Sequence, residues 1–86
     1  MPEIEYKENV LKMFKEDEIK EKSKLSFRLV KWSKNPPVFE IRMFYRDKEG
    51  NWKHGKLRAL DRNKLLWLKE HYDEVMQEFD NADKAE

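Results

Sequence analysis

The chain has 86 residues, 43% of them charged, and a formal net charge of +1 at pH 7. This length predicts one domain with a core that is only just large enough to be stable without a partner. The absence of cysteine excludes disulfides and thiolate metal sites, and the longest apolar run, Leu65 to Leu68, is too short to span a membrane. We therefore expect a cytoplasmic or nucleoid-associated protein without membrane contact.

The first element that the sequence predicts is an amphipathic helix over residues 4–16, "IEYKENVLKMFKE". Ile4, Val10, Leu11 and Phe14 fall on one side of a helical wheel. The run also lacks the alternation of a strand.

Two stretches with a period of two predict half-buried strands. In residues 25–32, Leu25, Phe27 and Leu29 alternate with other residues until the prolines of "SKNPP" end the strand. Residues 38–46 alternate in the same way. Phe39, Ile41 and Met43 point to one side, and the other side carries Glu40, Arg42, Phe44 and Arg46.

A third strand and a helix complete the predicted fold. After the turn "DKEGN", residues 52–59 predict a strand with Gly55 as a possible bulge. Asp61 is a suitable N-cap for a helix that follows. The core-facing stripe of this helix is predicted to hold Leu65, Leu68, Tyr72, Val75, Met76 and Phe79.

Trp67 and Leu66 lie outside that stripe. An exposed tryptophan is costly in a chain of this size, so Trp67 either folds over a neighbouring loop or contacts another subunit. Residues 80–86 are a polar, acidic tail that we expect to be frayed.

The net charge hides three unlike segments. Residues 1–19 have a net charge of −3, residues 20–58 of +8, and residues 59–86 of −4. Such a basic centre is typical of proteins that bind a polyanion, although a solvated lysine-rich surface gives the same pattern.

Strand parity adds aromatic rings to the basic side chains. If the apolar side of each strand faces the core, the opposite side carries Arg28, Trp32, Arg42, Phe44 and Arg46. Rings beside cations suit bases that stack while their phosphates lie on the charges. The alternative is that Trp32 and Phe44 form a cross-strand pair or lie under the N-terminal helix.

The sequence offers little for catalysis. His54 and His71 lie far apart in the sequence, with no His-x-x-x-His motif and no glycine-rich phosphate loop. We therefore expect no enzyme, no metal site and no cofactor.

Several short motifs occur in a characteristic order: "EIR", the adjacent rings Phe44 and Tyr45, "DKEG", "KHGK", and Leu60 before a helix that contains "LKE". In these motifs and in the order of its elements, the chain resembles the positive cofactor four family of transcriptional coactivators and its prokaryotic and viral relatives. The similarity covers about residues 19–79.

The resemblance implies an α+β fold, with a curved four-stranded antiparallel sheet followed by a C-terminal helix that packs on it and through which the chain forms a homodimer. It places a first strand at about Glu18 to Lys22, so that the predicted N-terminal helix becomes an extension of the fold. The implied organisation is an N-terminal helical extension at 1–17, a single-stranded DNA-binding domain at 18–79 and an acidic tail at 80–86.

Parity and the resemblance together predict the binding residues. The resemblance contributes Lys24, Lys31, Trp32, Lys34, Arg42, Tyr45, Lys53 and Lys56, and parity contributes Arg28, Phe44 and Arg46, with Trp52 at the loop rim. Whether Phe44 or Tyr45 stacks on a base stays open. The predicted dimer interface comprises Leu65, Leu66, Trp67, Tyr72 and Met76.

The leading hypothesis is a homodimer that binds single-stranded or melted DNA without sequence preference, in transcription, replication or recombination. The alternatives are a module that docks on a replication or transcription protein, and a protein that binds single-stranded RNA.

Overall fold

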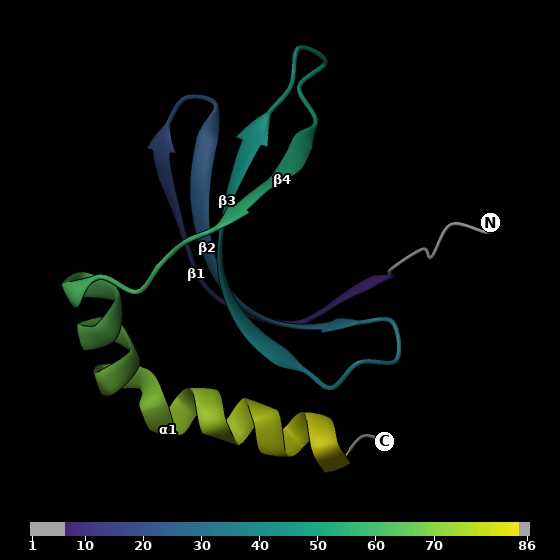
Figure 1. Cartoon of the computed structure of the whole chain (residues 1–86), viewed down its shortest axis with the longest axis vertical. Coiled ribbons are helices and arrows are strands. Elements are labelled where there is room, and N and C mark those ends of the chain that lie inside the picture. Colours follow the sequence, from purple (N-terminus) through teal and green to yellow (C-terminus); the bar gives the residue numbers. More distant parts are fainter. Residues whose placement is uncertain (1–6, 85–86) are drawn as a thin grey trace.

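The computed structural model describes residues 7–84, which form a four-stranded antiparallel sheet followed by one helix (Figure 1). Neighbours in the sequence are neighbours in the sheet, whose order is β1-β2-β3-β4. The elements are β1 (Glu8–Lys20), β2 (Ser23–Trp32), β3 (Val38–Arg46), β4 (Trp52–Leu57) and α1 (Arg62–Lys84). This architecture confirms the α+β class. Within residues 7–84, no helix is long and apolar enough to cross a membrane.

The prediction of an N-terminal helix over residues 4–16 is wrong for the part that the structure describes. Residues from Glu8 onward belong to β1, which is the longest strand and pairs with β2 along its whole length. Residues 4–6 lie outside the described residues. The short first strand that the resemblance implied, at Glu18 to Lys22, covers only the end of this longer strand and the turn that follows it.

Bulges in β1 explain why its sequence does not indicate a strand. The pairing with β2 shifts register three times, at Leu11, Phe14 and Ile19. Each extra residue changes which face the next residues point to. As a result Val10, Met13 and Glu16 pair with alternate residues of β2 and share one face. This spacing of three explains why the sequence of β1 lacks the period-two alternation that predicts a strand.

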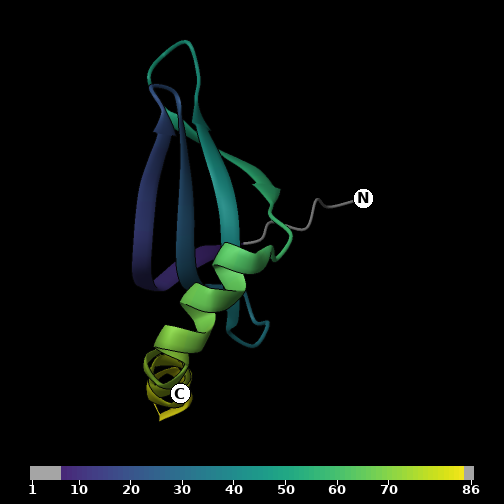
Figure 2. The same ribbon diagram turned by 90° about the vertical axis from the view of Figure 1, so that its left-hand side faces the viewer.

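The sheet bends sharply, and α1 lies against the outer side of the bend (Figure 1). Figure 2 shows the strands next to one another, with α1 in front of the lower part of the sheet. We call the side of the sheet that meets α1 the outer face and the opposite, concave side the inner face. A bulge in β4 between His54 and Leu57 adds to the irregularity, as predicted for Gly55. A Cβ atom on Gly55 would lie 2.7 Å from the carbonyl oxygen of Met43, so the close approach of β3 requires glycine there.

Aromatic side chains fill the space between α1 and the outer face. Trp67 packs against Phe27, with ring centroids 4.8 Å apart, and against Phe14 and Phe39, each at 6.1 Å. On its other side Trp67 stacks on His71 at 4.2 Å. Trp67 therefore packs on the sheet of its own chain and not over a neighbouring loop, so that interpretation was wrong, whereas its contact with another subunit stays a prediction.

Burial of Trp67 also changes which side of α1 faces the sheet. Val75 is buried as predicted, and Leu68 and Phe79 are partly buried. However, Leu65, Tyr72 and Met76 are 52%, 59% and 41% exposed. The predicted stripe is thus only partly correct. The sheet covers the side of α1 that carries Trp67, because that side chain has the largest apolar surface to bury.

The two ends of α1 bear on two sequence-based predictions, the N-cap and the C-terminal tail. Asp61 is the N-cap, since its Oδ1 atom accepts a hydrogen bond from the backbone N–H of Lys64 at 3.0 Å. The prediction of a frayed tail from residue 80 is wrong as far as Lys84, where α1 ends; residues 85 and 86 lie outside the described part.

Candidate nucleic-acid interface

A buried arginine lies at the centre of the inner face. Arg28 on β2 is only 2% exposed, and Glu40 of β3 is directly opposite it in the register. The Nε and Nη2 atoms of Arg28 donate to Glu40 Oε1 at 3.1 and 2.9 Å. Its Nη1 and Nη2 atoms also donate to the two carboxylate oxygens of Glu8, each at 3.0 Å. One guanidinium is therefore shared by two carboxylates, as a buried charge requires.

Glu40 connects this arginine to two further side chains. It is 6% exposed and also accepts from Arg42, at 3.2 Å from Nε and 3.1 Å from Nη2, and from Trp32 Nε1 at 2.9 Å. Burial alone would raise the pKa of Glu40, but the hydrogen bonds from Arg42, Trp32 and Arg28 outweigh it and lower the pKa. Glu40 is therefore ionised at neutral pH and fixes the indole of Trp32.

The side chain of Glu8 connects the two edge strands, β1 and β4, across the inner face. Its carboxylate, on β1, forms an ion pair with Arg28 and contacts the Nε2 atom of His54 on β4. These strands lie at opposite edges of the sheet, so the contact forms only because the sheet bends. Burial would raise the pKa of Glu8, but the hydrogen bonds with Arg28 and His54 lower it.

Cations lie over the three rings of the inner face. Lys24 Nζ is 4.4 Å from the ring centroid of Trp52 and 5.8 Å from that of Phe44. Arg28 lies 4.9 Å from the Phe44 ring and 6.0 Å from the Trp32 ring. The guanidinium of Arg46 lies 4.6 Å from Trp52. Each distance falls within the range of cation–π attraction.

The structure brings together more than half of the predicted binding residues on this face. The members found on the inner face, by side-chain contact or by register, are Lys24, Arg28, Trp32, Arg42, Phe44, Arg46 and Trp52.

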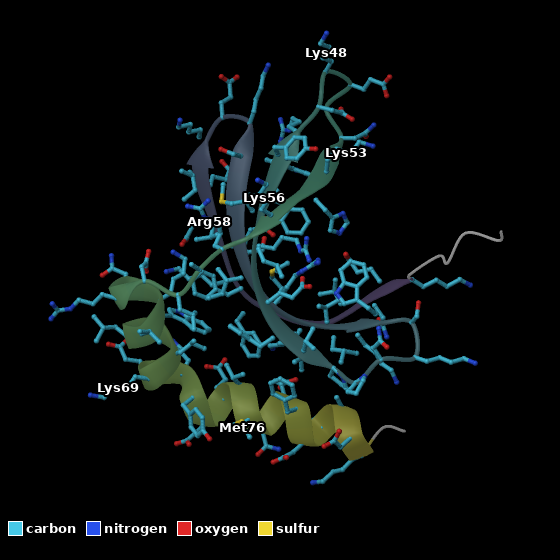
Figure 3. The ribbon with its side chains drawn as sticks, viewed as in Figure 1. Lys48, Lys53, Lys56, Arg58, Lys69 and Met76 are labelled. Carbon is cyan, nitrogen blue, oxygen red and sulfur yellow. The ribbon has the colours of Figure 1, made fainter. Side chains whose placement is uncertain are left out.

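The other predicted residues lie elsewhere. Lys31, Tyr45 and Lys53 have the opposite parity and belong to the outer face, whereas Lys34 lies in the turn after β2 and Lys56 at the bulge in β4. Figure 3 shows Lys48 and Lys53 around the β3–β4 loop, and Lys56 and Arg58 further along the chain.

The two adjacent rings of β3 point to opposite faces. Phe44 is 8% exposed and packs against His54, with ring centroids 5.0 Å apart. Tyr45 is 51% exposed and pairs with Ser23 on the other face. Phe44 is therefore the ring that belongs to the inner face, but the side chains around it leave little of it open.

Sequence reasoning placed Glu40 on this face but not among the site residues, and it missed Glu8 and His54 as parts of the face. Glu40 carried a usable signal, because it alternates with Arg42 and Phe44 along one strand. Glu8 lay inside a predicted helix, and its contact with His54 joins residues 46 positions apart. No local pattern indicates such a contact.

The charges of the inner face are largely balanced at its centre and less so toward the hairpin ends. Arg28 and Arg42 are paired with Glu8 and Glu40. Lys24 pairs with Glu16 at 3.1 Å. Among the described residues, Arg46 has no carboxylate partner, so its charge is satisfied only by the Trp52 ring and solvent.

An apolar hollow lies at the other side of the molecule, between β3, the segment after β4 and the start of α1. Its volume is about 380 Å³, and it is lined mainly by Val38, Phe39, Ile41, Leu57, Leu60 and Leu68. In the part of the chain that the structure describes, no group of three or more His, Asp or Glu side chains could hold a metal ion.

Comparisons of this chain with models of known protein families, with curated proteins and with solved structures found no match. The resemblance to the positive cofactor four family therefore stays a prediction.

Proposed function

We propose that the chain binds single-stranded DNA on the inner face without sequence preference. The observation that carries the proposal is the gathering of Trp32, Phe44 and Trp52 on one concave face, each within about 6 Å of a cation. Concave surfaces that combine stacking rings with positive charge are typical of proteins that bind single strands.

Stacking and charge have separate roles in this proposal. Trp32 and Trp52 are partly exposed, so each can offer a ring face to a base, which contributes roughly 1 to 3 kcal/mol per base whatever its identity. Lys24 and Arg46 lie beside Trp52, where they can meet the neighbouring phosphates. Such a surface suits DNA that has been unwound for transcription, replication or recombination.

The direct test is a titration of a labelled oligo-dT and of a duplex of the same length at several salt concentrations. We expect tighter binding of the single strand, and a log–log salt slope of about −0.7 for each phosphate that is neutralised. Equal affinity for the duplex, or affinity that is independent of salt, would contradict the proposal.

We further propose that the protein acts as a homodimer through α1. Four of the five predicted interface residues, Leu65, Leu66, Tyr72 and Met76, are between 41% and 59% exposed, and Met76 is labelled on α1 in Figure 3. An apolar strip of this kind, next to an apolar hollow, needs cover in a small protein. The fifth, Trp67, already packs within its own chain.

The mass of the protein in solution tests this interface. A dimer that becomes a monomer on Tyr72→Glu, with the helix content preserved, supports it. A monomer at high concentration would overturn it.

The same apolar strip favours a second candidate function, a module that docks on a replication or transcription protein. This candidate predicts a monomer without affinity for oligonucleotides, so the two experiments above separate it from the first. Competition between oligo-dT and oligo-U distinguishes DNA from RNA, because stacking and charge serve both.

A further inference from the structure

The strongest anion-binding geometry on the inner face is already occupied by the protein itself. Arg28 presents Nη1 and Nη2 to the two oxygens of Glu8 at 3.0 Å each. A guanidinium fork binds a phosphate in the same bidentate way as a carboxylate. His54 contacts the same carboxylate from β4, so two nitrogen-bearing side chains converge on one anion.

An aromatic ring lies beside this fork. The Trp32 ring lies 6.0 Å from the Arg28 guanidinium and 5.8 Å from the His54 ring. A phosphate held in the fork would therefore place an adjoining base within reach of Trp32.

We propose that Arg28 and His54 form a phosphodiester-binding subsite that Glu8 occupies in the free protein, so that a single strand must displace the Glu8 side chain to bind there. This inference rests on the proposed function, and it deepens it by naming a subsite and the internal competitor of the ligand.

Glu8 is suited to being displaced, and Glu40 is not. The Glu8 side chain is 25% exposed, whereas that of Glu40 is 6% exposed and accepts hydrogen bonds from three side chains. Glu8 also lies at the beginning of an edge strand. Rotation of its side chain would uncover the Nη1 and Nη2 atoms of Arg28 while Glu40 keeps the guanidinium in place.

The binding of a phosphate at the Arg28 fork thus requires a step that its binding at the other cations does not, the displacement of Glu8. At Arg46, which has no carboxylate partner within residues 7–84, a phosphate would add to the site, but at Arg28 it exchanges one anion for another. Glu8 consequently weakens the affinity for single strands and makes their binding at the fork conditional on opening the contact between β1 and β4.

The experiment compares oligo-dT binding by the wild type, Glu8→Gln and Glu21→Gln at one salt concentration, with circular dichroism to verify folding. Both variants change the net charge by +1, but Glu21 is exposed in the β1–β2 turn and away from the fork. We expect Glu8→Gln to lower Kd by about three- to ten-fold, and Glu21→Gln by less than two-fold.

The outcomes distinguish this inference from the proposed function. If the wild type binds oligo-dT and Glu8→Gln binds no tighter than Glu21→Gln, the inference is overturned and the function stands. If neither the wild type nor Glu8→Gln binds, the function itself is wrong, and the inference with it. If only Glu8→Gln binds, the subsite is supported and Glu8 blocks it in the wild type.

Discussion

The two faces of the sheet contain similar numbers of rings but hold them in different ways. On the outer face, Phe14, Phe27 and Phe39 pack on Trp67. On the inner face, each ring lies against a lysine, an arginine or His54 rather than against another phenylalanine or tryptophan. The presence of aromatic residues on both sides of a strand therefore says little about function, and what separates the faces is the chemistry of the neighbours.

The stabilising interactions of the faces differ accordingly. Burial of apolar area on the outer face is non-directional and tolerates small rearrangements. The inner face depends on directional, charge-assisted hydrogen bonds around Arg28 and Glu40, which fail together when one partner is lost. The inner face should therefore be the more sensitive of the two to a single conservative substitution and to pH.

The largest effect is expected from Glu40→Gln on the inner face. It keeps the shape of the side chain but removes the charge that Arg28 and Arg42 share. We expect a loss of about 3 kcal/mol in the free energy of unfolding, because the loss of one partner of a buried ion pair leaves the other uncompensated. Urea unfolding at a fixed protein concentration measures this loss. Glu49→Gln, at an exposed position, is the control. If Glu40→Gln lowered the free energy of unfolding no more than Glu49→Gln does, the network around Glu40 would contribute nothing to stability.

Trp67→Ala on the outer face should have a somewhat smaller effect. Trp67 touches three phenylalanine rings but is only partly buried. We expect a loss of about 2 kcal/mol, below the roughly 3 to 5 kcal/mol of a fully buried aromatic residue. The same unfolding experiment, with Glu70→Ala on the exposed side of α1, gives the comparison. If Trp67→Ala proved much more damaging than Glu40→Gln, the contrast between the faces would be reversed.

Lowering the pH should destabilise the inner face more than the outer face. The effect is smaller than that of the two substitutions and grows gradually as the pH falls. The pKa values of Glu8 and Glu40 are lowered in the folded protein, since their hydrogen bonds from arginine outweigh the effect of burial. Their contribution to stability is fully present above the unfolded pKa of about 4.3 and is lost as the pH falls through the lower folded pKa values.

Thermal unfolding of the wild type, Trp67→Ala and Glu40→Gln between pH 7 and pH 3 tests this. The wild type and Trp67→Ala should lose stability in parallel, and Glu40→Gln should lose less because one of the two carboxylates is absent. Identical pH profiles for all three would exclude the network as the source of acid sensitivity.

The sequence was sufficient where the signal is local. The alternation along β2 and β3 and the N-cap at Asp61 predicted both strands and the start of α1, because period and capping are properties of neighbouring residues. Gly55 was recognisable as a bulge for the same reason.

Prediction from the sequence failed where contacts between residues distant in the chain determine the structure. The bulges at Leu11 and Phe14 removed the period-two alternation of a strand from the sequence of β1. The side of α1 that meets the sheet was chosen by Trp67, whose large apolar surface outweighs the stripe of smaller residues. The contact of Glu8 with His54 depends on the bend that brings the edges of the sheet together, and no local pattern encodes it.

Intrinsic fluorescence tests the functional difference between the faces most directly, because the chain has three tryptophans and only Trp67 lies on the outer face. In Trp67→Phe the emission comes from Trp32 and Trp52 alone. The proposed stacking predicts that oligo-dT quenches this emission to saturation, at the same concentration at which a labelled oligonucleotide binds. Binding of the oligonucleotide with unchanged emission from Trp67→Phe would contradict the assignment of the inner face as the site.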